Sequence, residues 1–166
     1  MHDTSEPGSA GTSGRPDFNR LLVAVRETVR RGASRDQTLQ ELSALLKDAV
    51  PHYDWVGFYL VDPAADRELV LGPYAGAPTD HTRIPFGRGI CGQAAATEQT
   101  FIVQDVSREG NYLSCSPDVQ SEIVVPIRRD GKVIGELDID SHALAPFTPE
   151  DRAFLERVCA DLTALF

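Results

Sequence analysis

Three stretches of the chain carry apolar residues at the three- and four-residue spacing of an amphipathic helix. The first covers 17–32. The second, 34–50, opens with Ser34 and Gln37 at the spacing of a capping box. The third runs over 148–166, with a threonine as N-cap and a proline at its first position. The pattern therefore predicts two helices near the start of the chain and one at its end.

Between these helices the pattern changes to short runs rich in β-branched and aromatic residues, which favour strands. The chain also contains a Gly-Arg-Gly turn followed by small residues, which predicts a short helix, and then a polar loop. The expected strands are 55–61, 68–72 and 101–106 with a hairpin over 121–140, the short helix is 90–96, and the loop is 107–120. Helices flanking an antiparallel hairpin predict one α/β domain of the α+β type.

The hairpin over 121–140 predicts which side chains share a face of the sheet. A two-residue loop at Asp130-Gly131 would place Ile123 across from Asp138 and mix apolar with charged positions. A three-residue loop over 129–131 keeps one face wholly apolar, and register follows the buried face. This second register puts Glu122 directly across from Asp138. The apolar face then holds Ile123, Val125, Ile127, Val133, Gly135, Leu137 and Ile139, and the other face holds Glu122, Val124, Pro126, Ile134, Glu136, Asp138 and Asp140.

The four carboxylates on one hairpin face admit two interpretations. Like charges on neighbouring strands are destabilising, but water screens them on a solvated outer face. Alternatively, the face lines a site, where crowded carboxylates raise one another's pKa and one of them stays protonated as an acid. Glu122, Asp138 and Asp140 are the candidate binding residues.

The three cysteines occupy different environments. Cys91 lies at the start of the predicted short helix, where the helix N-terminus lowers a thiol pKa, although a small packed residue is an equal alternative. Cys115 lies in the polar loop, which is unusual for a residue that normally behaves as a buried hydrophobe and therefore favours chemistry. Cys159 falls on the apolar stripe of the last helix and is expected in the core.

Composition and charge exclude several classes of protein. The formal net charge of −9, without a Lys/Arg cluster, argues against a nucleic-acid partner. The apolar runs are shorter than the roughly 20 residues that cross a bilayer, and three cysteines are no secreted disulfide framework. We therefore expect a cytoplasmic protein with a disordered tail over 1–16 and one domain over 17–166. The apolar stripe of the first helix can pack on this domain or on a second copy.

The remaining motifs predict neither a metal nor a cofactor. The four histidines lack metal-ligand spacing, which leaves only a carboxylate site with His142 as an alternative. The glycines at 87, 89 and 92 match a dinucleotide fingerprint in letters alone, because the flanking βαβ unit is missing.

Five motifs, in the same order along about residues 17–166, resemble the GAF-domain free methionine-(R)-sulfoxide reductases. The resemblance implies a GAF fold, in which helices pack on one face of an antiparallel sheet and a ligand pocket lies on the other. The motifs are Trp55-x-Gly57-Phe58-Tyr59, Leu71-Gly72-Pro73-Tyr74, Arg83-Ile84-Pro85-Phe86-Gly87-Arg88-Gly89-Ile90-Cys91-Gly92, Ser121-Glu122-Ile123-Val124-Val125-Pro126 and Asp138-Ile139-Asp140-Ser141.

The resemblance also implies an activity: thiol-dependent reduction of free methionine sulfoxide, with Cys115 as nucleophile, Cys91 as a second thiol and a thioredoxin-type reductant. The three candidate carboxylates would hold the substrate, and Trp55 and Tyr59 would wall its methyl-sulfur end, unless these aromatics are plain core. The reductases usually carry a further cysteine near the position of His81. The alternatives are a non-catalytic GAF module that senses a small amine-bearing molecule or redox state, and a structural or dimerisation domain.

Overall fold

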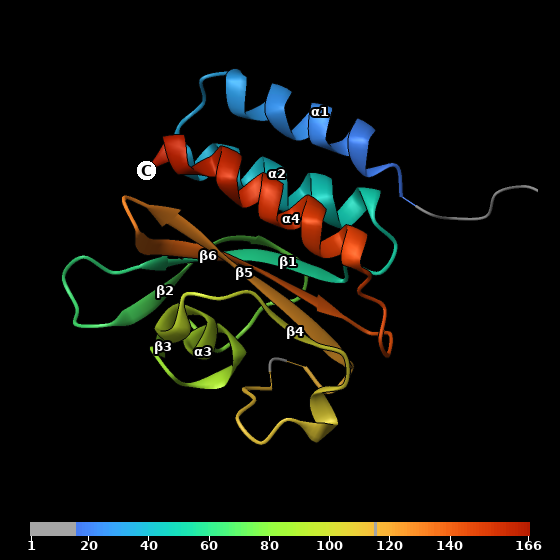
Figure 1. The fold of residues 1–166 in the computed structure, drawn as a ribbon, viewed down its shortest axis with the longest axis vertical. Coiled ribbons are helices and arrows are strands. Elements are labelled where there is room, and N and C mark those ends of the chain that lie inside the picture. Colours follow the sequence, from blue (N-terminus) through green and yellow to red (C-terminus); the bar gives the residue numbers. More distant parts are fainter. Residues whose placement is uncertain (1–15, 115) are drawn as a thin grey trace, which may run out of the picture.

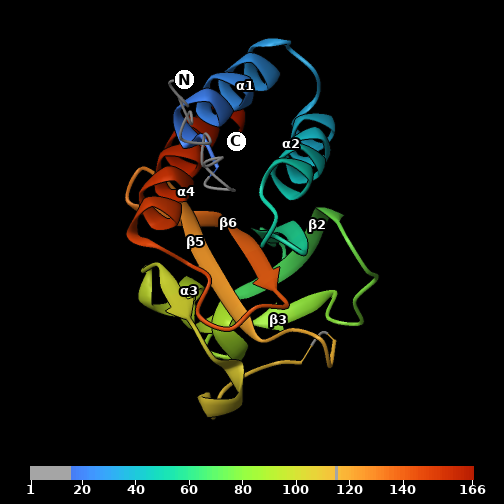
Figure 2. The same ribbon diagram turned by 90° about the vertical axis from the view of Figure 1, so that its right-hand side faces the viewer.

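The computed structural model describes residues 16–114 and 116–166, which form an antiparallel sheet with helices on both faces (Figure 1). Three helices cover one face, and a short helix with long loops covers the other (Figures 1 and 2). The strand order across the sheet is β3-β2-β1-β6-β5-β4. The strands are β1 (Trp55–Val61), β2 (Glu68–Ala75), β3 (Arg83–Pro85), β4 (Phe101–Val103), β5 (Ser121–Arg129) and β6 (Lys132–Ser141). The α+β prediction is confirmed.

Two of the helices begin where their predicted capping residues, Ser34 and Thr148, placed them. In α1 (Phe18–Arg30), Asp17 accepts a hydrogen bond from the backbone of the first turn. In α2 (Arg35–Ala49), Ser34 and Gln37 form the expected capping box. The last helix, α4 (Pro149–Leu162), starts after Thr148, which forms a second capping box with Asp151. None of the helices in the described ranges is long and apolar enough to cross a bilayer.

The main core lies between the sheet and α1, α2 and α4. Apolar residues of all three helices pack there against the inward side chains of β1, β5 and β6. Cys159 is buried in this core, as its position on the helical stripe predicted. Helix α1 packs on both α2 and α4, so its apolar stripe is covered within the chain.

The predicted hairpin register is wrong in detail, although the two faces are largely right. The turn has two residues, Asp130 and Gly131, both with positive φ, as a type I′ turn requires. One extra residue, Ile134, then bulges out of β6, because Ile127 pairs with Gly135 while the next residue of β5 pairs with Val133. Loop length alone therefore does not determine the register of this hairpin, since a bulge shifts it as well.

The bulge has two consequences for the predicted faces. Ile134 packs against the main core instead of joining the carboxylate face. Glu122 pairs with Asp140, and Asp138 pairs with Val124, so the predicted pairing of Glu122 with Asp138 is wrong. The total shift of two residues preserves the alternation, and all four carboxylates therefore remain on one face.

Two shorter elements also differ from expectation. Strand β4 ends at Val103, after which the chain forms a single 3-10 turn over Val106–Arg108. Strand β3 was not predicted, since three residues that end in proline carry too little pattern. Helix α3 (Gly89–Thr97) corresponds to the predicted short helix.

Candidate active site

The face of the sheet opposite the main core gathers the candidate residues from β1, β5 and β6. Trp55, Gly57 and Tyr59 alternate along β1 and point to this face. They pair across to β6 with, in the same order, Asp140, Asp138 and Glu136. Glu122 joins from β5 as the neighbour of Asp140. The strand alternation thus builds one surface from segments that are distant in sequence.

This carboxylate surface is buried, which excludes the interpretation as a solvated outer face. The exposed fraction is 0% for Glu136, 2% for Asp138, 2% for Asp140 and 5% for Glu122. Helix α3 lies over this face and packs on both β5 and β6 (Figure 1). A second apolar cluster, which includes Trp55 and Tyr59, packs between α3 and this face of the sheet.

Burial changes the protonation of these acids because a low-dielectric environment disfavours the charged form. It raises the pKa of Asp138 to about 6. Burial, and then the charge of Asp138, raise the pKa of Asp140 and Glu136 well above the usual range. The face therefore carries protons at neutral pH that a solvated carboxylate would have lost.

Cys91 lies beneath this face at the third position of α3, and its thiol donates a 3.7 Å hydrogen bond to Oε1 of Glu122. The expectation of a lowered pKa is wrong. Burial, followed by the charges of Asp138 and the other carboxylates, raises the pKa of Cys91 well above its usual value. The desolvation of a side chain with 4% exposure outweighs the helix N-terminus.

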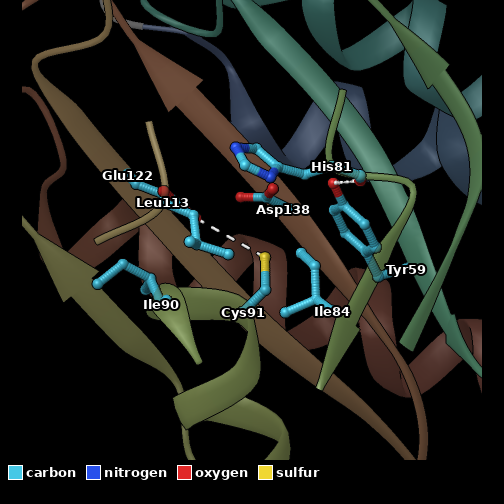
Figure 3. Close-up of a pocket in the computed structure, with 9 residues that line it drawn as sticks. Tyr59, His81, Ile84, Ile90, Cys91, Leu113, Glu122 and Asp138 are labelled. Atoms are coloured by element: carbon cyan, nitrogen blue, oxygen red, sulfur yellow. Dashed lines mark hydrogen bonds between the residues drawn. The ribbon is translucent and has the colours of Figure 1, made fainter. Parts of the chain in front are cut away.

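A small inner cavity connects the thiol to two of the carboxylates (Figure 3). Its volume of about 10 Å³ is close to the space of one water molecule. The side chains of Cys91, Glu122 and Asp138 converge on it in Figure 3. Its other lining residues are Tyr59, His81, Ile84, Gly89, Ile90 and Leu113. Among the described residues, no lysine or arginine lines this cavity.

A larger outer pocket of about 330 Å³ lies next to the inner cavity. Trp55 and Asp140 line it, and Asp140 is the cross-strand neighbour of Glu122 in the inner cavity. The Trp55 indole stacks on Tyr74 and donates a hydrogen bond to the carbonyl of Ala77. Pockets for small molecules usually have volumes of about 300–1,000 Å³. The outer pocket falls within this range, whereas the inner cavity is far too small for such a molecule. The predicted site residues thus divide between two adjoining spaces.

Cys115 lies outside the described residues, but the segment before it borders the inner cavity. Leu113 lines the cavity, and His81 Nε2 donates a 2.9 Å hydrogen bond to the carbonyl of Ser114. Tyr59 donates its hydroxyl hydrogen to the carbonyl of His81. A chain of contacts therefore connects β1, through His81, to the backbone that leads to Cys115.

Three features of the site escaped prediction as functional. Glu136 was assigned to the acidic face but not to the site, although it alternates with Asp138 and Asp140 along β6. Nothing in the sequence around His81, apart from its position relative to the family motifs, indicated the contacts that this residue makes. Gly57 leaves room for the Trp55 indole, because a Cβ there would collide with the ring and lie 2.7 Å from Cβ of Tyr74.

One group of side chains has the composition of a metal site. The ligand atoms of Cys91, Glu122 and Asp138 all lie within 4.8 Å of one another, and all three residues are buried. They come from α3, β5 and β6, so no spacing within a single motif could have indicated them.

This fold and this site have counterparts among known proteins. Residues 34–165 match the GAF domain family. The chain is 41% identical to the free methionine-R-sulfoxide reductase of Escherichia coli, covering 88% of this chain and 82% of that protein. It is 38% identical to Protein YtsP of Bacillus subtilis, with 88% of each covered. The chain therefore belongs to the GAF domain family and, within it, to the free methionine-R-sulfoxide reductase family.

Solved structures agree with this assignment. The free methionine-R-sulfoxide reductase from Neisseria meningitidis, determined in complex with its substrate, has a TM-score of 0.85 and 38% identity, covering 100% of this chain and 96% of that one. The reduced form of fRMsr of Staphylococcus aureus has a TM-score of 0.84 and 34% identity, covering 91% and 96% respectively. The predicted GAF fold is confirmed, with α1, α2 and α4 on one face of the sheet and the pocket, beside α3, on the other.

Proposed function

We propose that this protein reduces free methionine-(R)-sulfoxide to methionine. The observation that carries the proposal is a buried carboxylate face next to a thiol. Asp138 and Glu122 line the inner cavity, Asp140 lines the adjoining outer pocket, and all three are almost completely buried. The named relatives and the substrate complex of the Neisseria meningitidis reductase support the same activity.

The charge of this face suits a free amino acid. Buried carboxylates are costly to keep charged, and a substrate ammonium beside Asp138 and Asp140 would supply a positive charge in a cavity that no described lysine or arginine lines. Methionine inside a peptide has no such ammonium, so the face selects the free amino acid. Trp55 and Tyr59 supply apolar walls on the same face, which suit a methyl-sulfur group.

The proposed chemistry uses two thiols in sequence. The thiolate of Cys115 attacks the sulfoxide sulfur and forms a sulfur–sulfur bond while the sulfoxide oxygen takes up a proton. The oxygen then forms a bond to the cysteine sulfur as the sulfur–oxygen bond of the substrate and the sulfur–sulfur bond both break, so that the cysteine becomes a sulfenic acid and methionine leaves. The Cys91 thiol then attacks the sulfenic sulfur, and water leaves as the disulfide forms. An external dithiol of the thioredoxin type reduces the disulfide to two thiols and is itself oxidised.

The buried acids supply protons to this sequence. The oxygen of the sulfoxide must be protonated as its bond to sulfur breaks, and a carboxylic acid within hydrogen-bond reach can donate that proton. Asp138 and Glu122 occupy the cavity that also contains Cys91. Burial keeps the pKa of Asp138 high, at about 6, which suits a residue that both holds and releases a proton.

The test is turnover of free methionine-(R)-sulfoxide with thioredoxin and, separately, with dithiothreitol, measured as methionine formed. We expect activity with both reductants, and none after Cys115→Ser. Cys91→Ser should lower the thioredoxin-dependent rate more than the dithiothreitol-dependent rate. Cys159→Ser is the matched control, since that thiol lies in the opposite core. An active Cys115→Ser protein would refute the assigned nucleophile.

A second candidate function has two observations in its favour. His81 stands near the place where these reductases usually carry a further cysteine, and Cys91 has a raised pKa, which disfavours its thiolate. The alternative is a GAF module that binds the same small amine without reducing it. Calorimetric binding of methionine sulfoxide without any methionine formed, under either reductant, would favour this alternative over the reductase.

A further inference from the structure

The group formed by Cys91, Glu122 and Asp138 fits more than a proton network. A tetrahedral zinc site has metal–sulfur and metal–oxygen distances of about 2.3 and 2.0 Å, which place a sulfur and an oxygen ligand about 3.5 Å apart. Cys91 Sγ and Oε1 of Glu122 are 3.7 Å apart. All three ligand atoms lie within 4.8 Å of one another. Small side-chain movements would therefore bring them onto one ion.

An independent observation indicates that the group needs a cation. Oδ1 of Asp138 is buried without a hydrogen-bond partner among the described residues, and this side chain lines the same cavity as the thiol. Oδ1 of the neighbouring Asp140 is also buried and has no hydrogen-bond partner in the part of the chain that the structure describes. A buried oxygen without a donor carries a desolvation penalty. A bound cation would remove it.

The size and composition of the cavity favour a metal ion over an organic cation when substrate is absent. Its volume of about 10 Å³ suits one ion or one water and no larger group. One thiolate with two carboxylates is a ligand set of intermediate softness, which suits Zn²⁺ better than the all-oxygen preference of Mg²⁺ or Ca²⁺. Three protein ligands leave the fourth position for water.

We propose that Cys91, Glu122 and Asp138 form a binding site for a thiophilic divalent cation of the zinc class. Binding breaks the sulfur–hydrogen bond of Cys91 and forms a sulfur–metal bond, and the proton is released to solvent. No electron is transferred. The ion occupies the carboxylates that the proposed function assigns to the substrate ammonium, so metal and substrate exclude each other. Only this exclusion rests on the proposed function.

The experiment uses Co²⁺ as a spectroscopic probe for the zinc class, added to the full-length reduced protein. We expect a thiolate-to-cobalt charge-transfer band that appears on titration, disappears when Zn²⁺ displaces cobalt, and is absent in Cys91→Ser. Asp138→Asn should weaken cobalt binding by about tenfold or more, because one of three ligands is lost. Cys159→Ser, which removes the buried core thiol, should keep the band unchanged.

Several results would overturn the proposal. These are no charge-transfer band in the wild type, a band that survives in Cys91→Ser, or a band lost in Cys115→Ser while Cys91→Ser retains it. Circular dichroism establishes that each variant is folded. A second measurement needs no variant: native mass spectrometry of the reduced protein should show one tightly bound Zn²⁺ per chain that a chelator removes, and a spectrum without bound Zn²⁺ would contradict the site.

Competition separates the metal site from the proposed function. Free methionine sulfoxide should raise the cobalt concentration required for half-saturation, and Zn²⁺ should inhibit turnover until a chelator is added. A protein that forms the Cys91 band but never reduces the sulfoxide would retain the metal site and lose the reductase proposal. A protein that reduces the sulfoxide but forms no charge-transfer band would retain the reductase proposal and lose the metal site.

Discussion

Replacing Glu136 with methionine should stabilise the protein. The Glu136 side chain is 0% exposed, and neither of its carboxylate oxygens has a hydrogen bond of good geometry among the described residues, although the weak donor Cys91 Sγ–H lies near it. An unpartnered buried polar group costs about 1–3 kcal/mol in protein substitution data. Methionine keeps the length and flexibility of the side chain without its polar atoms. The free energy of unfolding should therefore rise by about 1–3 kcal/mol.

The assay is urea and thermal unfolding at neutral pH. For a domain of this size, 1 kcal/mol corresponds to a shift of about 2–4 °C, so the midpoint should rise by about 2–12 °C. Glu136→Gln should gain less, because its amide remains unpartnered. Glu27→Met, on the exposed side of α1, is the control and should stay within about 0.5 kcal/mol of the wild type. A less stable Glu136→Met protein would refute the claim that this carboxylate lacks a stabilising partner.

Three further predictions test the packing around Trp55, the hydrogen bonds of Asp151 at the start of α4, and substrate selection. Gly57→Ala should lower the free energy of unfolding by about 1–3 kcal/mol and shift the Trp55 fluorescence, because the new Cβ overlaps the indole. Gly110→Ala, which has open space around it, is the control and should leave the stability nearly unchanged. An unchanged Trp55 spectrum in Gly57→Ala would contradict the collision. Although burial of Asp151 opposes it, hydrogen bonds from His52, Thr148 and Tyr53 lower the pKa of this carboxyl. Its contribution is therefore present above the ordinary value of 3.8 and lost as pH falls through the lower folded-state pKa. Urea unfolding of Asp151→Asn should show a loss of about 1–3 kcal/mol at neutral pH that narrows below about pH 4; a difference independent of pH would count against the network. N-acetyl-methionine sulfoxide should not be reduced, because it has no ammonium for Asp138 and Asp140; turnover equal to that of the free amino acid would remove the carboxylates from substrate recognition.

Local signals in the sequence predicted the helices and β1 well. A capping box such as Ser34 with Gln37 is decided within one turn of backbone, and it appears as expected. The strand Trp55–Val61 has the predicted bounds because its composition is unmistakable. Strand β3 has too few residues for such a signal, and its pairing with β2 depends on the whole sheet.

The site was predictable as a face but not as an environment. Alternation along β6 was enough to assign Asp138 and Asp140 to one surface with Glu122, even in the wrong register. Their burial depends on α3, which no hairpin pattern specifies. The pKa of Cys91 was misjudged for the same reason, since its helix position was visible in the sequence and its carboxylate neighbours were not. The assignment of Cys115 remains a prediction.

The most direct test of the central claim uses an equimolar mixture of the (R)- and (S)-sulfoxide diastereomers of free L-methionine with excess dithiothreitol. Methionine release is followed to completion, and the residual diastereomers are separated by chromatography. The reductase account predicts a plateau at half conversion, with only the (S) form left, and no methionine from Cys115→Ser. Complete conversion of both diastereomers, or no methionine at all from the folded wild-type protein, would contradict it.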